Sequence, residues 1–217
     1  MPAVSAATVF FGGTFDPPHL GHLSVIRGLR QQTGLPVLVV PTGEPVHRSS
    51  PRASRRQRAE MVALAIQPLG DPLVTISQHE LEQSQPGYTV DTVQWLRSRT
   101  PERSVVLALG SDVAVALPGW KDVGRLLEQV RLLVFERPGV GEPGEVVLGE
   151  LRRLRLPLEG AEVVAIPAPV VDATGIRDRL ARGEDCSDLL PPAVSRYIGA
   201  HGLYRNPPEA ANSSRAG

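Results

Sequence analysis

The stretch Phe11-Gly12-Gly13-Thr14-Phe15-Asp16-Pro17-Pro18-His19-Leu20-Gly21-His22 decides the fold of this chain. It follows an apolar, β-branched segment and precedes an amphipathic one, so it predicts a strand, a glycine turn and the start of a helix. Backbone N–H groups at a helix start lack intrahelical partners, and glycines let the backbone approach a ligand closely. His19 and His22 are three residues apart, which places both imidazoles on one face of the first helical turn. The stretch therefore predicts a binding site for a polyanion.

These glycines do not match the two best-known phosphate-binding patterns. The stretch contains neither the Gly-x-Gly-x-x-Gly of dinucleotide-binding folds nor the Gly-Lys-Ser/Thr of P-loop proteins. It reads Gly-Gly-Thr-Phe-Asp-Pro-Pro followed by His-x-Gly-His. This resembles the signature of the nucleotidyltransferases, which transfer a nucleoside monophosphate from a triphosphate.

The composition fits one α/β domain. The chain has 217 residues, 41% of them hydrophobic, with 23 Lys+Arg against 23 Asp+Glu. That length and apolar content suffice for a packed core. Because the net charge is zero, nothing in the overall composition argues for binding to nucleic acid or to a membrane. Any anion site must therefore be local.

The cysteine content and the N-terminal segment indicate the compartment. The single cysteine, Cys186, cannot form an intramolecular disulfide, which favours a reducing cytosol. Residues 1–7 contain no basic region or long apolar run, and no stretch approaches the ~20 apolar residues of a membrane span. We expect a soluble cytoplasmic protein.

Apolar runs alternate with helix-like segments along the chain. Most of these runs are short, rich in Val, Ile or Leu, and lack polar alternation, as strands buried on both faces of a parallel sheet do. Strands are predicted at Ala7–Phe11, Pro36–Val40, Leu73–Ile76, Val105–Leu109, Arg131–Phe135 and Val163–Ile166. Helices are predicted at Leu20–Gln32, Arg55–Gln67, Val90–Arg99, Gly124–Gln129, Glu145–Leu154 and Ala193–His201. This order predicts an α/β fold with a doubly wound, Rossmann-like parallel sheet.

The domain boundaries follow from the same pattern. We expect a single domain over residues 1–204, in which 167–204 form a small C-terminal helical part. Residues 205–217 are small, polar and rich in Pro, Ala and Ser, which is typical of a disordered tail. In a doubly wound sheet ligands bind beyond the carboxyl ends of the strands, so we expect the chemistry in the loops that follow the strands.

The loop after the second predicted strand leads into an arginine-rich segment. Five arginines lie between Arg48 and Arg58. They can form a solvated helix face, bind nucleic acid, or, at His47 and Arg48, grip a second phosphate with the planar guanidinium fork. The nucleic-acid interpretation is disfavoured because few aromatic residues interleave with these arginines and the chain has no basic excess.

Capping residues mark three further helix starts. Ser54 with Gln57 three residues later forms a capping-box pattern. Thr89 and Thr174 are each predicted to cap a helix. With Arg177, Thr174 places a hydroxyl and a guanidinium on one first turn, which suits the far end of a triphosphate.

Three other residues are candidates for specific roles. Asp112 lies just after Gly110 and the fourth predicted strand. It can contact a ribose, bind a metal, or cap the following helix. Trp120 lies outside any periodic apolar pattern, so it can stack on a planar ring or fill a loop. Trp95 lies on a predicted amphipathic helix and is expected in the core.

Several stretches together resemble the bacterial nicotinate mononucleotide adenylyltransferases. In order they are Gly-Gly-Thr-Phe-Asp-Pro-Pro-His-Leu-Gly-His (12–22), Pro-Thr-Gly-Glu-Pro-Val-His-Arg (41–48), Gly-Tyr-Thr-Val-Asp-Thr (87–92), Gly-Ser-Asp (110–112), Pro-Gly-Trp (118–120), Arg-Pro-Gly (137–139), Thr-Gly-Ile-Arg (174–177) and His-Gly-Leu-Tyr (201–204). The resemblance covers nearly the whole chain apart from the tail. It implies transfer of AMP from ATP to nicotinate mononucleotide, which gives deamido-NAD and pyrophosphate in NAD biosynthesis.

The resemblance also implies roles for individual residues. The catalytic residues would be His19, His22 and Arg177. ATP would be bound by Gly12, Gly13, Thr14, Phe15, His19, His22, Gly110, Asp112, Arg137, Thr174, Ile176 and Arg177. Nicotinate mononucleotide would be bound by His47, Arg48, Tyr88, Thr89 and Trp120. Mg²⁺ would accompany ATP, and no residue is predicted as a metal ligand.

Two positions depart from the family pattern. Asp172 stands where the family usually has serine, so a negative charge lies near the expected triphosphate; it can help hold Mg²⁺ or face away. Arg48 replaces the usual lysine and keeps the cation.

Other functions compete with this interpretation. The nearest is a sister adenylyl- or cytidylyltransferase acting on pantetheine phosphate, nicotinamide mononucleotide or another phosphorylated acceptor. A regulatory nucleotide-binding module without catalysis is disfavoured because His19 and His22 are both present. The sequence leaves the oligomeric state open, a homo-oligomer included.

Overall fold

The computed structural model describes residues 7–43, 50–83, 87–137, 139 and 141–205. Its core is one six-stranded sheet in the order β3-β2-β1-β4-β5-β6, and every neighbouring pair is parallel. The strands are β1 (Ala7–Gly13), β2 (Val37–Pro41), β3 (Val74–Ile76), β4 (Ser104–Gly110), β5 (Val130–Glu136) and β6 (Glu162–Ala165). All six strands expected from the apolar runs are confirmed, each within two residues of the predicted ends.

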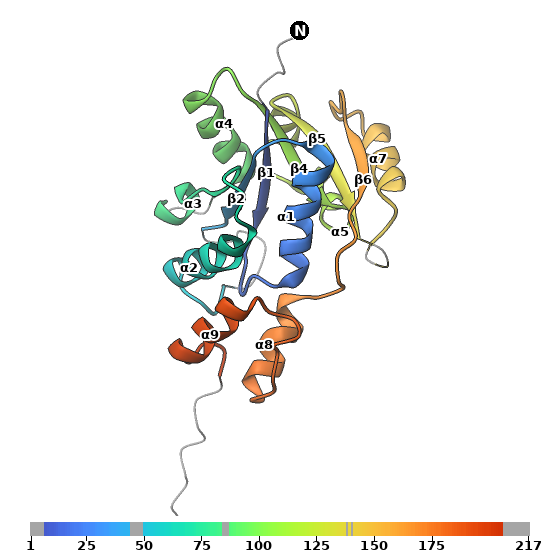
Figure 1. Cartoon of the computed structure of the whole chain (residues 1–217). Coiled ribbons are helices and arrows are strands. Elements are labelled where there is room, and N and C mark those ends of the chain that lie inside the picture. Colours follow the sequence, from blue (N-terminus) through green and yellow to red (C-terminus); the bar gives the residue numbers. More distant parts are fainter. Residues whose placement is uncertain (1–6, 44–49, 84–86, 138, 140, 206–217) are drawn as a thin grey trace, which may run out of the picture.

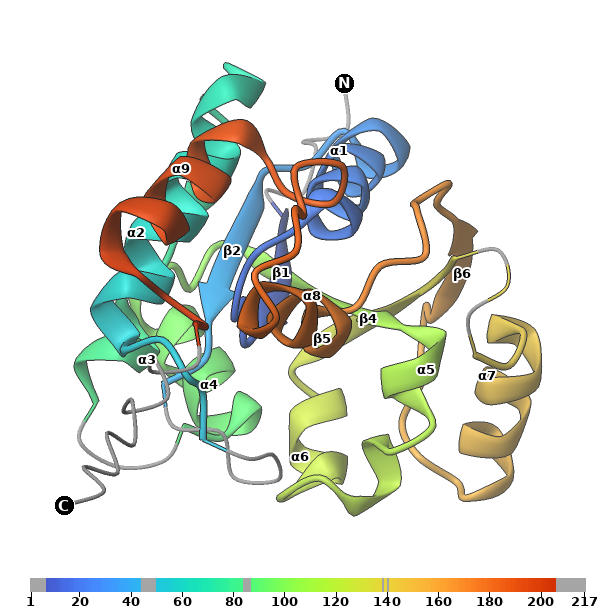
Figure 2. The ribbon, with the colours of Figure 1, turned by 90° about the horizontal axis from the view of Figure 1, so that it is seen from below.

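Helices cover both faces of the sheet (Figures 1 and 2). The longer ones are α1 (Leu20–Thr33), α2 (Arg55–Ile66), α4 (Thr89–Arg99), α7 (Gly144–Arg153), α8 (Ala173–Ala181) and α9 (Pro192–His201). Shorter ones are α3 (His79–Glu82), α5 (Ser111–Ala114), α6 (Val123–Leu127) and two 3₁₀ turns, Gln67–Leu69 and Leu117–Gly119. The predicted doubly wound α/β class is confirmed, although α3, α5 and the 3₁₀ turns were not expected.

Side chains of β1 point alternately to the two faces of the sheet, and a different set of helices covers each face. Val9 and Phe11 belong to a buried cluster with Ile26 of α1 and Val62 of α2. Phe10, between them, belongs to a second cluster on the opposite face, with residues of α4, α6 and α7. Successive side chains of a strand point to opposite faces, so a strand of continuous apolar residues buries both. This explains why the predicted strands show no polar alternation.

The strand order places a topological switch point between β1 and β4. The chain runs outward from β1 to β3 in one direction and from β4 to β6 in the other. Crevices at such a point, beyond the carboxyl ends of the strands, are where open α/β sheets bind ligands. Figure 2 looks onto this edge, and α8 lies across it.

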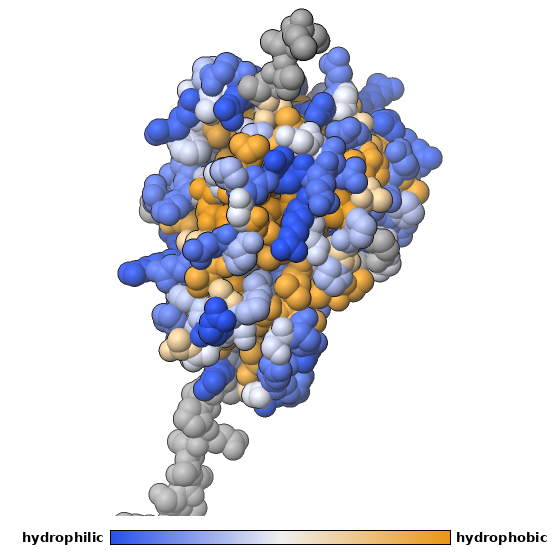
Figure 3. Space-filling model, in the orientation of Figure 1, coloured by the Kyte–Doolittle hydropathy of each residue, from blue (hydrophilic) through white to orange (hydrophobic). Residues whose placement is uncertain are grey.

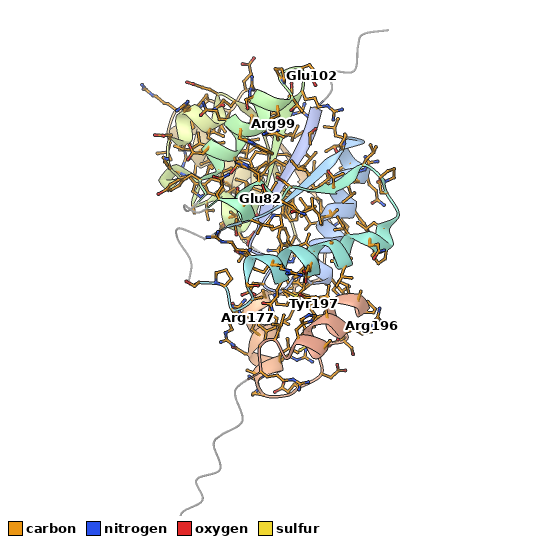
Figure 4. The ribbon with its side chains drawn as sticks, turned by 90° about the vertical axis from the view of Figure 1, so that its left-hand side faces the viewer. Glu82, Arg99, Glu102, Arg177, Arg196 and Tyr197 are labelled. Atoms are coloured by element: carbon orange, nitrogen blue, oxygen red, sulfur yellow. The ribbon has the colours of Figure 1, made fainter. Side chains whose placement is uncertain are left out.

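The C-terminal helices pack against the main body through a third apolar cluster. It joins Leu23 of α1, Met61 of α2, Ile176 of α8 and Ile198 of α9. Figure 4 shows Tyr197 between α9 and α2, where its hydroxyl donates a hydrogen bond to Glu60. The predicted tail falls almost entirely on residues outside the described ranges.

The surface has mixed character. On the face drawn in Figure 3, apolar patches lie between strongly hydrophilic side chains, and neither kind covers the face. Within the described part of the chain, no helix is long and apolar enough to cross a membrane. Trp95, expected in the core, is half-buried instead: its ring stacks on His79 at 3.8 Å, and Arg99 lies over it. An aromatic ring covered by a guanidinium is stable at the surface, which periodicity does not reveal.

Candidate active site

The two histidines build the start of α1 between them. His19 is the N-cap residue, and its Nδ1 accepts a hydrogen bond from the backbone N–H of His22. In return, Nδ1 of His22 accepts from the backbone N–H of His19. The rings stack with centroids 3.7 Å apart. The predicted common face is confirmed, and the pair closes a reciprocal capping box that the residue types alone do not suggest.

These hydrogen bonds fix the protonation of both rings. Because each Nδ1 is an acceptor, each neutral imidazole carries its proton on Nε2, which is left as a donor. Burial and the Arg137 charge lower the pKa of His19 to about 4, against a smaller opposing effect of Asp172. Burial, His19 and Arg137 hold the pKa of His22 well below its ordinary value. Near neutral pH the site therefore offers two uncharged N–H donors.

Close packing leaves no room for side chains around this pair. A Cβ on Gly21 would lie 3.0 Å from Nδ1 of His19 and 3.3 Å from the carbonyl oxygen of Pro169. A Cβ on Gly13 would lie 3.0 Å from the Phe15 ring, which is itself buried beside His22. Phe15 thus supports the histidine ring rather than exposing its own side chain to a ligand.

A charged pair lies where β4 and β5 end, at the same end of the sheet as the histidines. Arg137 donates from Nη2 to Asp112 at 3.1 Å. Asp112 lies in the first turn of α5 after buried Gly110, and no side chain caps that helix. The capping alternative for Asp112 is therefore wrong, because its carboxylate is paired with Arg137. The structure brings both charges to the carboxyl end of the sheet, where the histidines lie.

The start of α8 completes this half of the site. Arg177 donates from Nη1 to the backbone oxygen of Asp16 at 2.8 Å and from Nη2 to the hydroxyl of Thr174 at 3.1 Å. The cap of α8 is Asp172, which accepts from the backbone N–H of Gly175 at 2.8 Å. The prediction that Thr174 caps α8 is thus wrong. Aspartate is a stronger N-cap than threonine, and its position three residues before Gly175 was the available signal.

Ile176, which is predicted to bind ATP, has a buried side chain. The side chain is 1% exposed and lies in the apolar cluster of α1, α2, α8 and α9. Only its backbone can face a nucleotide, so Ile176 orients α8 rather than contacting ATP through its side chain.

Two of the residues predicted to bind the mononucleotide, Tyr88 and Trp120, lie on the face of the sheet that α4, α6 and α7 cover. Tyr88 and Trp120 are half-buried and pack against one core cluster, and Lys121 lies over the Tyr88 ring at 4.2 Å. The structure thus brings the two aromatic rings to the same side of the core. Thr89 was expected to cap α4, but α4 begins at Thr89 with Tyr88 as its N-cap residue and no side-chain cap. His47 and Arg48 lie outside the described residues.

Two buried polar residues hold the loops of the site, and sequence patterns did not single them out for that role. The Asp16 carboxylate accepts from the backbone N–H groups of Arg52 and Ala53 at 2.8 and 3.0 Å. The Arg58 guanidinium donates to carbonyl oxygens in the loops after β1 and β2: Thr14 at 2.9 Å, Thr42 at 2.6 Å and Gly43 at 2.8 Å. The confirmed capping box of Ser54 and Gln57 indicated where α2 begins, but not which arginine of that helix is buried.

Comparisons with known proteins agree with this geometry. A sequence model described as cytidylyltransferase-like matches residues 10–185. A protein of Pectobacterium atrosepticum, named a probable nicotinate-nucleotide adenylyltransferase, is 39% identical over 94% of this chain and 100% of its own. The nicotinate-nucleotide adenylyltransferase of Salmonella typhi is 36% identical over 90% of this chain and 97% of its own.

Solved structures share the fold. The nicotinic acid mononucleotide adenylyltransferase of Plasmodium falciparum, complexed with NaAD, superposes with a TM-score of 0.74 at 19% identity over 91% of this chain and 97% of that one. Its complex with APC gives a TM-score of 0.71 at 20% identity, over 92% and 97%. The fold, the paired histidines of α1 and the full-length similarity lead to one conclusion: this chain belongs to the nicotinate-nucleotide adenylyltransferases, within the cytidylyltransferase-like family.

Proposed function

We propose that this chain transfers AMP from ATP to nicotinate mononucleotide, releasing pyrophosphate and forming deamido-NAD for NAD biosynthesis. The observation that carries the proposal is the pair of neutral Nε2 donors of His19 and His22 at the carboxyl end of β1. Full-length similarity to nicotinate-nucleotide adenylyltransferases supports the choice of acceptor. Cys186 is a free, buried cysteine, which suits an enzyme of the reducing cytoplasm.

The chemistry needs positioning more than proton transfer. A phosphate oxygen of the mononucleotide forms a bond to the α-phosphorus of ATP, while the bond from that phosphorus to the bridging oxygen of the β-phosphate breaks. The attacking oxygen is already ionised at neutral pH, so no strong general base is required. Catalysis then rests on alignment and on stabilising the charge that develops on the α-phosphate.

In this proposal the two histidines serve the α-phosphate. Each presents an Nε2–H donor fixed in direction by the capping box, so no reorganisation is needed when charge develops. Each neutral ring keeps its proton on Nε2 because its Nδ1 is the acceptor of the capping hydrogen bond. The backbone of Gly12 and Gly13 and the Thr14 side chain line the same loop.

The leaving pyrophosphate would be held at the start of α8. Thr174 and Arg177 lie together there, and the helix N-terminus adds its own partial positive charge. Asp112 and Gly110, with Arg137, would contact the AMP portion at the ends of β4 and β5. The arrangement thus runs across the switch point from α1 to α8.

The acceptor would occupy the other side of the crevice. Tyr88, Thr89 and Trp120 would recognise the nicotinate ring, with backbone N–H groups favouring its carboxylate over an amide. His47 and Arg48 would hold the mononucleotide phosphate. The half-buried rings of Tyr88 and Trp120 on one core cluster support this placement.

Mg²⁺ would enter with the nucleotide. The described residues contain no group of three or more His, Cys, Asp or Glu side chains able to hold a metal ion. Mg²⁺ commonly keeps several waters and binds through substrate phosphates with one or two carboxylates, so this donor set fits an ion carried by ATP. Asp172 is the carboxylate whose charge acts on His19, and it could face such an ion while capping α8.

An acceptor panel tests the proposal. The protein is incubated with ATP, Mg²⁺ and one acceptor at a time: nicotinate mononucleotide, nicotinamide mononucleotide or pantetheine phosphate. Pyrophosphate release is then measured, with CTP replacing ATP in a parallel series. We expect the highest kcat/KM with ATP and nicotinate mononucleotide. Preference for pantetheine phosphate or CTP would place the chain among its sister transferases.

A further inference from the structure

A buried carboxyl group lies between Gly43, after β2, and Gly87, before α4. Glu80 belongs to the short helix α3 and is only 4% exposed. A Cβ on Gly43 would lie 2.3 Å from the backbone oxygen of Glu80, and a Cβ on Gly87 would lie 3.1 Å from its Oε2. The loop after β2 can approach Glu80 this closely only because position 43 is glycine, and a side chain at position 87 would crowd the Glu80 carboxyl group.

Hydrogen bonds tie this carboxyl to both segments. Oε1 of Glu80 accepts from the hydroxyl of Thr92 at 2.7 Å, and Thr92 lies in α4 one turn after Tyr88. The backbone N–H of Gly43 donates to the same carboxyl group. Burial raises the pKa of Glu80, and these two donors together with the Arg58 charge oppose that rise.

Arg58 holds the other side of the same peptide segment. While Glu80 binds the N–H of Gly43, the Arg58 guanidinium binds its carbonyl oxygen at 2.8 Å. The last described residue before the segment that contains His47 and Arg48 is thus held by two buried, oppositely charged side chains. Arg58 also fixes the loop after β1, so one network connects the α-phosphate side of the site to the acceptor side.

We propose that Glu80 is a positioning residue for the acceptor: through Gly43 and Thr92 it holds the end of the loop after β2 against the start of α4, where Tyr88 and Thr89 are proposed to recognise the nicotinate ring. This inference rests on the proposed acceptor site. Glu80 itself touches no reacting atom. A carboxylate is the suitable group because both of its oxygens accept hydrogen bonds, whereas a glutamine amide offers one acceptor oxygen and one donor nitrogen.

The test compares variants that change this network by one group each. Glu80→Gln keeps the volume but replaces one acceptor oxygen by an NH2 group, which can only donate. Thr92→Val removes the hydroxyl, and Thr92→Ser retains it. Glu82→Gln, on the exposed side of α3 (Figure 4), is the matched control. We expect Glu80→Gln and Thr92→Val to raise the KM for nicotinate mononucleotide by about 10- to 100-fold, the usual effect of losing a hydrogen bond to a charged group.

The comparison of KM values separates positioning from general support of the fold. The KM for ATP should stay within about threefold in all four variants, and Thr92→Ser and Glu82→Gln should keep the acceptor KM of the unaltered protein. Equal rises in both KM values, or a lower melting temperature with an unchanged acceptor KM, would overturn the inference. If Glu80→Gln fails to fold, the Thr92 pair decides the matter.

Failure of the proposed function has a different signature. If the unaltered protein releases pyrophosphate only with another acceptor, the choice of nicotinate mononucleotide is wrong. The same variants are then compared on that acceptor, where a selective rise in its KM still supports Glu80 as the positioning residue and an unchanged KM refutes it.

Discussion

The hydroxyl of Tyr204 donates a 2.7 Å hydrogen bond to the carboxylate of Asp16, 188 residues earlier in the chain. The same carboxylate accepts hydrogen bonds from the backbone N–H groups of Arg52 and Ala53, just before α2. The backbone oxygen of Asp16 accepts a hydrogen bond from Arg177. Tyr204, three residues after the end of α9, is therefore joined to the loop that precedes His19. The C-terminal part thus holds the loop before His19 in place.

Removing this hydroxyl should destabilise the fold. Tyr204 is 6% exposed, and Tyr204→Phe leaves a buried carboxylate with one donor fewer, which costs about 1.5–3 kcal/mol. Urea unfolding measures the change. Tyr197→Phe is the matched control: it removes a hydroxyl that binds Glu60 in a more exposed setting, where we expect less than about 1 kcal/mol. Equal losses in the two variants would contradict the special role of Asp16.

Crowding around His19 predicts the effect of a single methyl group. In Gly21→Ala the new Cβ would lie 3.0 Å from Nδ1 of His19, so the ring must shift from its capping position. We expect kcat to fall at least about 10-fold while the protein stays folded, because misplacing a preorganised donor weakens transition-state stabilisation. Steady-state kinetics and circular dichroism measure both quantities.

A second glycine in a helix serves as the control for that change. Gly149 lies in α7, and a Cβ there meets nothing within 4 Å. Gly149→Ala should leave kcat unchanged and stabilise the protein by up to about 1 kcal/mol, since alanine favours helix over glycine. Full activity in Gly21→Ala would show that the close packing of His19 does not matter.

The histidine pair also predicts how stability depends on pH. The pKa of His19 is 6.5 when unperturbed and about 4 in the folded protein, so between these values only the unfolded chain takes up the proton. The free energy of unfolding is therefore undiminished above pH 6.5 and falls as the pH drops towards 4, by on the order of 3 kcal/mol for His19 alone. Chemical unfolding at pH 7.5, 6, 5 and 4 measures the slope.

A double variant isolates this contribution from that of the carboxylates. In His19→Asn/His22→Asn each Oδ1 can replace Nδ1 as the acceptor of the capping hydrogen bond, but nothing at these positions titrates. The slope between pH 6.5 and 4 should be shallower than in the unaltered protein. An identical slope would show that the histidines are not held neutral by the fold.

Sequence patterns predicted the helices and strands well, but they did not predict the buried side-chain contacts that hold the loops of the site. The strands followed from apolar runs such as Val105–Leu109, because a strand buried on both faces has little choice of residue. Arg58 and Glu80 gave no such signal: each is buried only because distant segments fold over it, and each looks locally like a solvated helix residue. The predicted roles of His47 and Arg48 stay predictions, since the structure does not describe these residues.

Adenylyl transfer itself is tested most directly at His22. His22→Asn keeps an acceptor for the N–H of His19 but removes the Nε2 donor. The control is His201→Asn, at the exposed end of α9. With ATP, Mg²⁺ and nicotinate mononucleotide, the rate of deamido-NAD formation is measured by chromatography. The account predicts product from the unaltered protein and from His201→Asn, and a kcat about 10²- to 10³-fold lower in folded His22→Asn. No deamido-NAD from the unaltered protein, or near-normal turnover in His22→Asn, would contradict it.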